Sequence, residues 1–212
     1  SLRISPMERC FETISPWINS VVLPGNPKFV PVIDQELTEV DYGSWSGRKL
    51  AVLSRNKMWK TVQESPSRMY FPGGEGIAQM QSRAMKSVHE AVSSKAKGSV
   101  VIVSHGDVIK SIVASALGMH LDEFQRIVID PASISILDFS TTKPRTLLLN
   151  DSRSVVTELL VAPKRSKNLL GGGAGRRGTN TLDLNALSLE QLENRGSGLS
   201  SFKSEVLTVY FR

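Results

Sequence analysis

The sequence predicts an α/β fold with three layers, α/β/α, around a mostly parallel central sheet. Ser99–Val103 is an apolar, mostly β-branched run between glycines, which is typical of a strand buried on both faces. A helix is predicted directly after it, at Asp107–Leu117, with its apolar residues on one side and Gly118 at its end. Predicted strands alternate with predicted helices over the first 150 residues, and this alternation indicates the fold class.

The elements before this strand follow from apolar periodicity and from turn residues. In chain order they are a short strand at Leu2–Ile4, a helix after Pro6, a strand at Phe29–Ile33, a helix at 48–63 and a long helix at 77–96. Pro31 indicates that its strand lies at an edge of the sheet, because proline has no N–H to donate. After the central helix, Ile134–Phe139 and Thr146–Leu149 predict a closing hairpin.

The composition of the chain changes at Pro163. Residues 171–178 are too rich in glycine to pack, and they lack the flanking elements of a P-loop or a dinucleotide-binding loop. We therefore predict a folded domain at 1–162 and a flexible Gly/Ser/basic tail at 163–212. Within the tail, Ser188 can cap one short helix, and Val206–Phe211 is either a strand or a disordered end.

Composition and charge exclude several classes of protein. A content of 40% hydrophobic and 22% charged residues argues against disorder throughout the chain. The lone Cys10 cannot form an internal disulfide, so we expect a reducing cytoplasm, and no apolar run is long enough to span a bilayer. Of the net charge of +6, the predicted tail carries +4, from eight Lys/Arg and four Asp/Glu. The remainder makes a nucleic-acid partner unlikely for the folded part.

The clearest candidate for chemistry is His105, where the buried strand ends. The helix that begins at Gly106 offers free backbone N–H groups and a positive dipole end, and both suit a phosphate group. Strand ends are also where α/β sheets bind ligands. His105 can be cationic toward an anion, or neutral as a nucleophile or base. His89 and His120 lack such surroundings, and we predict that both are solvent-exposed.

Two further places carry suitable side chains. Arg9 lies about one turn into the first helix, and its guanidinium can grip a phosphoryl group, although an isolated arginine is more often a surface residue. In the segment 37–47, Glu39 can act as a general acid if burial raises its pKa. Asp41 is its competitor, and the residues alone do not separate the two. The neighbouring Tyr42 and Trp45 are expected to pack this loop.

Taken together and in this order, these segments resemble the histidine phosphatase superfamily over about residues 2–150. The likeness is greatest to phosphoglycerate-mutase-like proteins of actinobacteria. The matching motifs are Ser5–Thr13, Leu37–Gly43, Phe71–Gly76 (with Gly76 where serine is usual), Val103–Asp107 and Asp130–Ser135. The resemblance implies that Arg9 and Gly106 bind the substrate's phosphoryl group. It also implies that Glu39, rather than Asp41, is the proton donor and that His105 stabilises the phosphoryl group.

The chain departs from the family in one large respect. Members begin with a central strand that ends in Arg-His-Gly, whose histidine is phosphorylated, and these 212 residues contain no Arg-His-Gly. We therefore expect an amino-terminal truncation and a sheet without its first strand, with exposed apolar surface and unpaired edges. By the resemblance, the complete protein transfers a phosphoryl group to histidine and requires no metal or cofactor.

Three function hypotheses follow. The leading one is a phosphatase for small phosphate esters, active when complete, with a phosphoglycerate-type phosphomutase as the alternative enzyme. A second is a catalytically inactive protein that binds a small phosphorylated metabolite or regulates through it. A third is nucleic-acid binding by the basic tail. For the chain as given, we predict no phosphohistidine formation.

Overall fold

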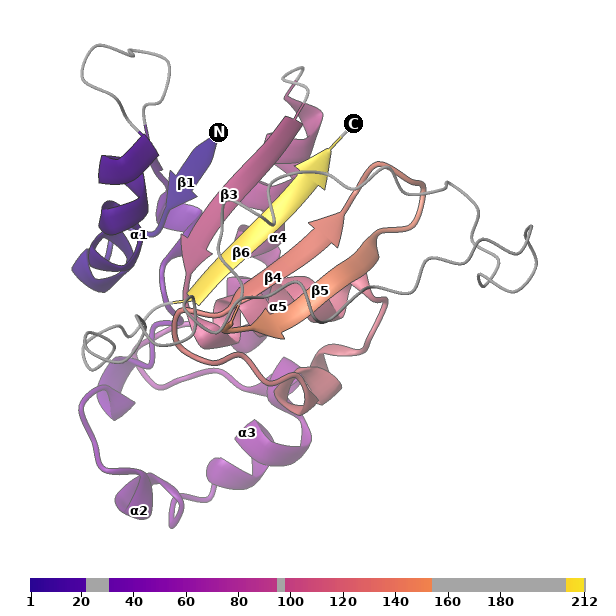
Figure 1. The fold of residues 1–212 in the computed structure, drawn as a ribbon. Coiled ribbons are helices and arrows are strands. Elements are labelled where there is room, and N and C mark those ends of the chain that lie inside the picture. Colours follow the sequence, from indigo (N-terminus) through magenta and orange to yellow (C-terminus); the bar gives the residue numbers. More distant parts are fainter. Residues whose placement is uncertain (22–30, 95–97, 154–204, 212) are drawn as a thin grey trace. The chain divides into compact units, whose positions relative to one another are not determined.

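Six strands form one mixed sheet in the order β2-β1-β3-β6-β4-β5 (Figure 1). The computed structural model describes residues 1–21, 31–94, 98–153 and 205–211. The strands are β1 (Leu2–Ile4), β2 (Val32–Ile33), β3 (Gly98–Ser104), β4 (Ile134–Asp138), β5 (Arg145–Asp151) and β6 (Glu205–Phe211). The pairings β1–β2, β1–β3 and β4–β6 are parallel, whereas β3–β6 and β4–β5 are antiparallel. The predicted fold class is confirmed, as are the edge position of β2 and the closing hairpin.

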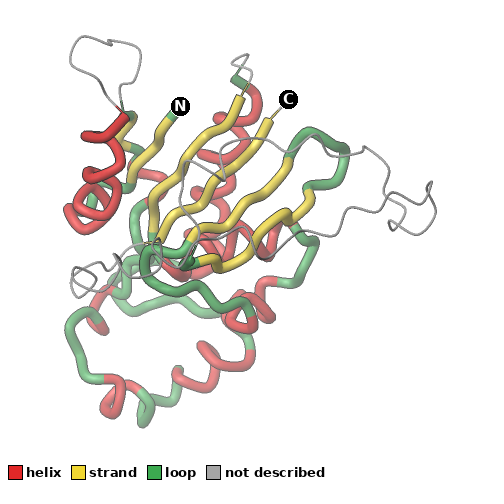
Figure 2. Tube along the Cα trace, in the orientation of Figure 1, coloured by secondary structure: helices red, strands yellow, loops and turns green. Residues whose placement is uncertain are grey.

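Helices pack on both faces of the strand β3, and its residues point alternately to one face and to the other. Val100 and Ile102 belong to the core that the strand forms with α4 (Ile77–Ser93) and α5 (Gly106–Ala116). Val101 and Val103 are also buried, and α1 (Glu8–Val21) contacts the strand. Figure 2 shows the helices and the sheet in the same orientation. Burial on both faces thus explains the apolar run Val100–Val103 within β3.

The strand β6 comes from the end of the chain and lies between β3 and β4. It pairs with all seven residues of β3, from Gly98 opposite Phe211 to Ser104 opposite Glu205. It also runs parallel to β4, with Ile134 opposite Val206. β3 is therefore paired along both sides, by β1 and by β6. Of the two alternatives for Val206–Phe211, the strand is confirmed; the rest of the predicted tail, at 163–204, lies outside the described residues.

The prediction of one helix at 48–63 was wrong in one respect, because the segment forms two short helices, α2 (Leu50–Leu53) and α3 (Trp59–Glu64). Between them, the Asn56 side-chain oxygen accepts a hydrogen bond from the backbone N–H of Met58, at 2.9 Å. Asparagine bonds of this kind compete with helical backbone bonds. The ring of Trp59 stacks on that of Trp45, with centroids 6.3 Å apart.

The helices predicted after Pro6, at 77–96 and at 107–117 are present, although α4 ends at Ser93, and the short helix predicted at Ser188 lies outside the described residues. α4 begins at Ile77 as expected, and α5 ends at Ala116, two residues before Gly118, whose φ of +66° suits the end of a helix. The short 3₁₀ helices are η1 (Gln35–Leu37), η2 (Gly43–Trp45), η3 (Pro66–Arg68) and η4 (Leu121–Arg126). Within the described ranges, no helix has the length and apolar character that a membrane crossing needs.

Candidate active site

The carboxyl ends of β1 and β3 bring the predicted site residues together. The two strands are parallel neighbours, with Ile4 opposite Val103, so the residues that follow them meet at one edge of the sheet. Ser5 follows β1, and its backbone N–H donates to the Val103 carbonyl at 2.9 Å. His105 follows β3 and precedes α5, while Arg9 lies in the first turn of α1.

His105 is 1% exposed, and both of its ring nitrogens have partners. Arg9 donates to Nδ1, at 3.2 Å from Nε and 2.8 Å from a terminal nitrogen. Since arginine can only donate, Nδ1 must accept, and the ring proton lies on Nε2. That nitrogen donates to Ser5 Oγ at 2.8 Å and lies 3.5 Å from the Cys10 sulfur. Burial, followed by the charges of Arg9 and Arg83, lowers the His105 pKa to about 3, so the imidazole is neutral.

Glu39 completes this group of side chains. One of its carboxylate oxygens lies 3.8 Å from a terminal nitrogen of Arg9 and 3.8 Å from His105 Nδ1. Burial, and then the negative charge of Asp107, raises the Glu39 pKa from 4.5 to about 7. The backbone N–H of Val40, which donates to Glu39 at 3.0 Å, opposes this change only in part. At neutral pH the carboxyl group therefore carries a proton about half of the time, as a general acid requires.

The backbone around Glu39 is held by an ion pair that sequence reasoning missed. Arg83, on α4, donates to the Glu36 carbonyl at 2.7 Å and to the Glu39 carbonyl at 3.1 Å. Its guanidinium also pairs with the Glu75 carboxylate, 2.5 Å at the nearest atoms. A carboxylate and two carbonyls thus fix one arginine, and the arginine fixes the loop that carries the acid. Arg83 and Glu75 are not at a spacing that marks an ion pair within one helix, so the sequence offered only their opposite charges as a signal.

Asp41, the competitor of Glu39, has a different place. It is exposed, and its side chain accepts a hydrogen bond from the Gly43 backbone N–H at 2.8 Å, which shapes the turn. Its backbone N–H donates to Glu75 at 3.0 Å. Gly74 lies against the same turn so closely that a Cβ would be 2.1 Å from the Asp41 carbonyl oxygen. The segment Phe71–Gly76 therefore braces the turn after Glu39, and Asp41 is used for structure.

A second link, also missed from the sequence, joins this loop to α5. The Tyr42 hydroxyl donates to the Asp107 carboxylate at 3.2 Å, and Lys110 donates to the other oxygen at 3.3 Å. Tyr42 also packs edge-on against Phe71, with ring centroids 5.0 Å apart. Burial raises the Tyr42 pKa, so the phenol remains a donor. Asp107 therefore acts on Glu39 both through its charge and through the loop.

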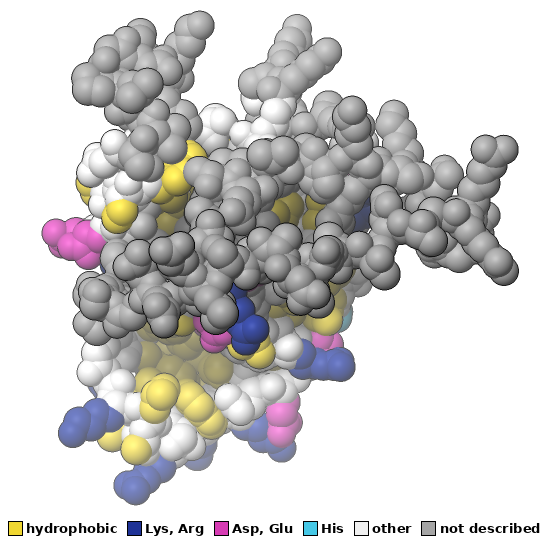
Figure 3. Space-filling model, in the orientation of Figure 1, with side chains coloured by type: hydrophobic (Ala, Val, Ile, Leu, Met, Phe, Trp, Pro, Cys, Tyr) yellow, Lys and Arg dark blue, Asp and Glu magenta, His cyan; other side chains and the backbone are white. Residues whose placement is uncertain are grey.

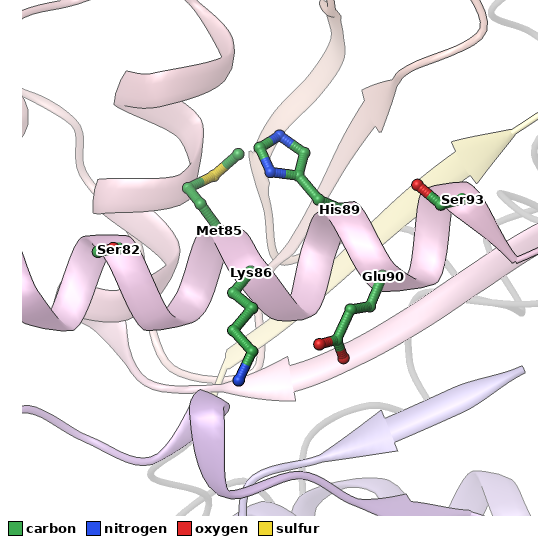
Figure 4. Close-up of a pocket in the computed structure, with 6 residues that line it drawn as sticks. All are labelled: Ser82, Met85, Lys86, His89, Glu90 and Ser93. Atoms are coloured by element: carbon green, nitrogen blue, oxygen red, sulfur yellow. The ribbon is translucent and has the colours of Figure 1, made fainter.

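The remaining predicted residues are placed as follows. Gly106 opens α5 directly after His105, with its backbone at the same edge of the sheet. His89 and His120 are exposed, which agrees with the prediction for both. His89 lines a depression on the outer side of α4, where six side chains of that helix gather (Figure 4). None of the predicted site residues lines this depression.

The segment between the acid loop and Phe71 is strongly basic. Residues 46–68, which include α2 and α3, hold six Lys/Arg and one acidic residue, Glu64. Leu50 and Val52 are 70% and 56% exposed there. Figure 3 shows hydrophobic side chains on this part of the molecule, with Lys and Arg around them. The charge of the folded part is thus uneven, and its excess lies beyond the carboxyl ends of β1 and β3 (Figure 1). Such a distribution attracts anions toward that edge.

Comparison with known proteins identifies the family. The sequence profile of the histidine phosphatase superfamily (branch 1) matches residues 2–152. The chain therefore belongs to this superfamily, a family of enzymes, as its motifs predicted. Every residue of the group formed by Arg9, Glu39 and His105 lies inside the matched range.

Individual proteins in the comparison have diverse names. The chain is 26% identical to phosphoserine phosphatase 1 of Hydrogenobacter thermophilus over 119 residues. This stretch covers 55% of the chain and 56% of that protein. It is 28% identical to the probable phosphoglycerate mutase GpmB of Erwinia tasmaniensis over 109 residues, a stretch that covers 50% of this chain and 51% of that protein. The chain thus spans about half the length of these relatives. The solved structure of the α-ribazole phosphatase from Shigella flexneri matches with a TM-score of 0.58 and 18% identity, over 71% of this chain and 72% of that one. This likeness establishes the fold.

Proposed function

We propose that this chain carries the phosphoryl-binding and proton-donating part of a phosphatase for small phosphate esters. The observation that carries the proposal is the meeting of Arg9, Glu39 and His105 at one sheet edge, with Glu39 3.8 Å from each of the other two. A guanidinium suits the phosphoryl group, and a carboxyl group with a pKa of about 7 suits protonation of the leaving oxygen. The basic segment 46–68 favours an anionic substrate.

In the proposed reaction, Arg9 turns from His105 Nδ1 to the incoming phosphoryl group and holds it. The charge of the bound dianion offsets that of Arg9, so we expect the pKa of His105 to rise and the imidazole to take up a proton. His105 can then donate to a phosphoryl oxygen and stabilise its charge in the transition state. Glu39 gives its proton to the ester oxygen as the P–O bond breaks.

The group that attacks phosphorus is a separate part of the proposal. By the family resemblance, a histidine nitrogen of an Arg-His-Gly motif forms the N–P bond as the ester bond breaks. Water then attacks the phosphohistidine and releases phosphate, with Glu39 taking a proton from the water. These 212 residues hold no such motif. We therefore propose the phosphohistidine step for the complete protein only.

Two alternatives rest on specific observations. A phosphomutase returns the phosphoryl group to the substrate, and one relative is named a probable phosphoglycerate mutase. A phosphate-binding protein without catalysis would use the same three residues, and the missing Arg-His-Gly motif favours it for this chain. We also propose a cytoplasmic location, since the sequence holds a single cysteine and so no internal disulfide.

Incubation with a ³²P-labelled phosphodonor separates these possibilities. We expect no acid-labile label on the 212-residue chain, but label and phosphate release from the complete protein. In the complete protein, Glu39→Gln should lower kcat for an alkyl phosphate by about 10² to 10⁴. Phosphoryl transfer between positions of phosphoglycerate, without phosphate release, would favour the mutase. Turnover that is unaffected by the Glu39 substitution would refute the proposed acid.

A further inference from the structure

The Ser5 hydroxyl and the Arg9 guanidinium contact different nitrogens of the His105 ring. Ser5 Oγ lies 2.8 Å from Nε2, whereas Arg9 donates to Nδ1. Ser5 and His105 are each 1% exposed, so their contact is shielded from solvent. A buried N–H costs free energy unless an acceptor faces it. Ser5 therefore supplies the acceptor that the ring proton on Nε2 needs.

The sheet fixes the position of Ser5 relative to the ring. β1 and β3 lie side by side and run parallel, with Ile4 opposite Val103 (Figure 1). The Ser5 backbone N–H continues this pairing, since it donates to the Val103 carbonyl at 2.9 Å. The backbone N–H of Met7 also points to Ser5 Oγ, at 3.4 Å. This second donor favours the hydroxyl oxygen as an acceptor, which is the role that Nε2–H requires.

The surroundings of His105 contain several charged or titratable side chains. In the described part of the chain they are Arg9 and Cys10 from α1, Glu39 from the loop after η1, Arg83 from α4 and Asp107 from the first turn of α5. Arg9 and Glu39 face Nδ1. At Nε2, the Cys10 sulfur lies 3.5 Å away, and sulfur is a weak acceptor. Among the described residues, Ser5 Oγ is thus the strong acceptor at Nε2.

We propose that Ser5 is a positioning residue, which holds the His105 ring proton on Nε2 and thereby makes the ring take up a second proton, on Nδ1, when the phosphoryl group binds. This inference rests on the proposed function. A bare ring nitrogen cannot donate to a phosphoryl oxygen. While Nε2–H stays bonded to Ser5, the ring can donate from Nδ1 only after it takes a proton from solvent. The result is an imidazolium beside the dianion, and a charged donor bonds an anion more strongly than a neutral one does.

Removal of the Ser5 hydroxyl allows another arrangement of the ring protons. In Ser5→Ala, Nε2–H has lost its acceptor. Once Arg9 has turned to the phosphoryl group, the ring can carry its single proton on Nδ1, with Nε2 bare. The Cys10 thiol is near enough to donate weakly to the bare nitrogen. The neutral ring then bonds the phosphoryl group without uptake of a proton, and the dianion has one cationic partner fewer.

The test compares Ser5→Ala with Ser104→Ala in the full 212-residue chain. Ser104 is the matched control, because it is buried next to His105 and its Oγ donates to the Leu37 carbonyl at 2.7 Å, away from the ring nitrogens. Calorimetry measures the affinity for inorganic phosphate at neutral pH. The ¹⁵N resonances of the His105 ring show which nitrogens carry a proton, and thermal unfolding checks that each variant folds.

We expect wild type and Ser104→Ala, when bound to phosphate, to carry protons on both ring nitrogens. Ser5→Ala should carry a proton on Nδ1 alone and bind phosphate on the order of tenfold more weakly. Both alanine variants should melt at a lower temperature than wild type, because each loses a buried hydrogen bond. The protonation of the ring therefore separates a positioning role from a merely structural one.

The possible results are distinct. If wild type binds phosphate and Ser5→Ala binds it equally well with both ring nitrogens protonated, the role of Ser5 is overturned while the proposed function stands. In wild type alone, a bare Nε2 before binding or a bare Nδ1 in the phosphate complex also overturns it. If Ser104→Ala changes the ring protons as Ser5→Ala does, the effect belongs to the fold around His105, and the inference again fails. If wild type binds no phosphate, the proposed function fails together with the inference.

Discussion

Replacing Glu39 by glutamine should make the protein more stable at neutral pH, although it removes the proposed proton donor. The Glu39 carboxyl group has a pKa of about 7 in the fold, against an ordinary value of 4.5. Between these values, the folded protein holds a proton that the unfolded chain has released. Rising pH therefore favours the unfolded state, and the free energy of unfolding falls across this window.

The size of this effect follows from the two pKa values. Each pKa unit corresponds to about 1.4 kcal/mol, so the ionised Glu39 lowers the free energy of unfolding by about 3 kcal/mol once the pH is well above 7. Glutamine is neutral in both states and lacks this dependence. The variant should thus match wild type near pH 4.5 and exceed it by up to about 3 kcal/mol near pH 8.

Urea unfolding of wild type and Glu39→Gln at about pH 5 and about pH 8 measures this difference. Contributions of other titrating groups, such as His105, cancel because both proteins share them. Glu64→Gln, at an exposed glutamate of α3, is the matched control and should stay within about 0.5 kcal/mol of wild type at both pH values. A Glu39→Gln difference that is the same at both pH values would refute the raised pKa and, with it, the acid at neutral pH.

Three further changes test the surrounding structure. Gly74→Ala should lower the free energy of unfolding in urea by about 1–3 kcal/mol, because the added Cβ would lie 2.1 Å from the Asp41 carbonyl oxygen. At Gly47, φ is +74° but the surrounding space is open, so Gly47→Ala should lower it by only about 1 kcal/mol. Burial acts to raise the Asp34 pKa, but hydrogen bonds and the charge of Arg3 outweigh it, so the pKa is lowered. Asp34→Asn should therefore lower the free energy of unfolding in urea by about 2 kcal/mol at pH 7. The difference from wild type should shrink as the pH falls below about 4. A chain that ends at residue 204 lacks β6 and should melt about 10 °C lower by circular dichroism, since β3 and β4 would then have unpaired edges; an unchanged melting temperature would contradict the pairing.

The parts of the fold that sequence reasoning anticipated are those with a local signal. β3 and α5 both carry a clear apolar pattern, and His105 lies at their junction, so its place at a strand end could be read directly. Glu39 and Asp41 could not be separated by residue type alone. The contacts in the fold separate them: Asp41 closes a local turn, whereas Glu39 faces the distant residues Arg9 and His105.

Other features depend on contacts between distant residues and left no local trace. The Arg83–Glu75 pair holds the acid loop from another helix, and the Ser5 hydroxyl fixes the His105 ring across 100 positions of sequence. The pairing of β6 between β3 and β4 is equally remote, because a short apolar segment near a chain end is compatible with a strand anywhere. The break between α2 and α3 depends on one Asn56 side-chain bond, which competes with a helix that periodicity favours.

The central claim is that Arg9, Glu39 and His105 form one site for a phosphoryl group. Titration of the 212-residue chain with inorganic phosphate, followed by calorimetry and by the ¹⁵N resonances of the His105 ring, tests it most directly. We predict saturable binding with uptake of a proton by His105, and loss of affinity of at least about tenfold in Arg9→Ala. Absence of binding in wild type, or equal binding in Arg9→Ala with an unchanged His105 ring, would contradict the claim.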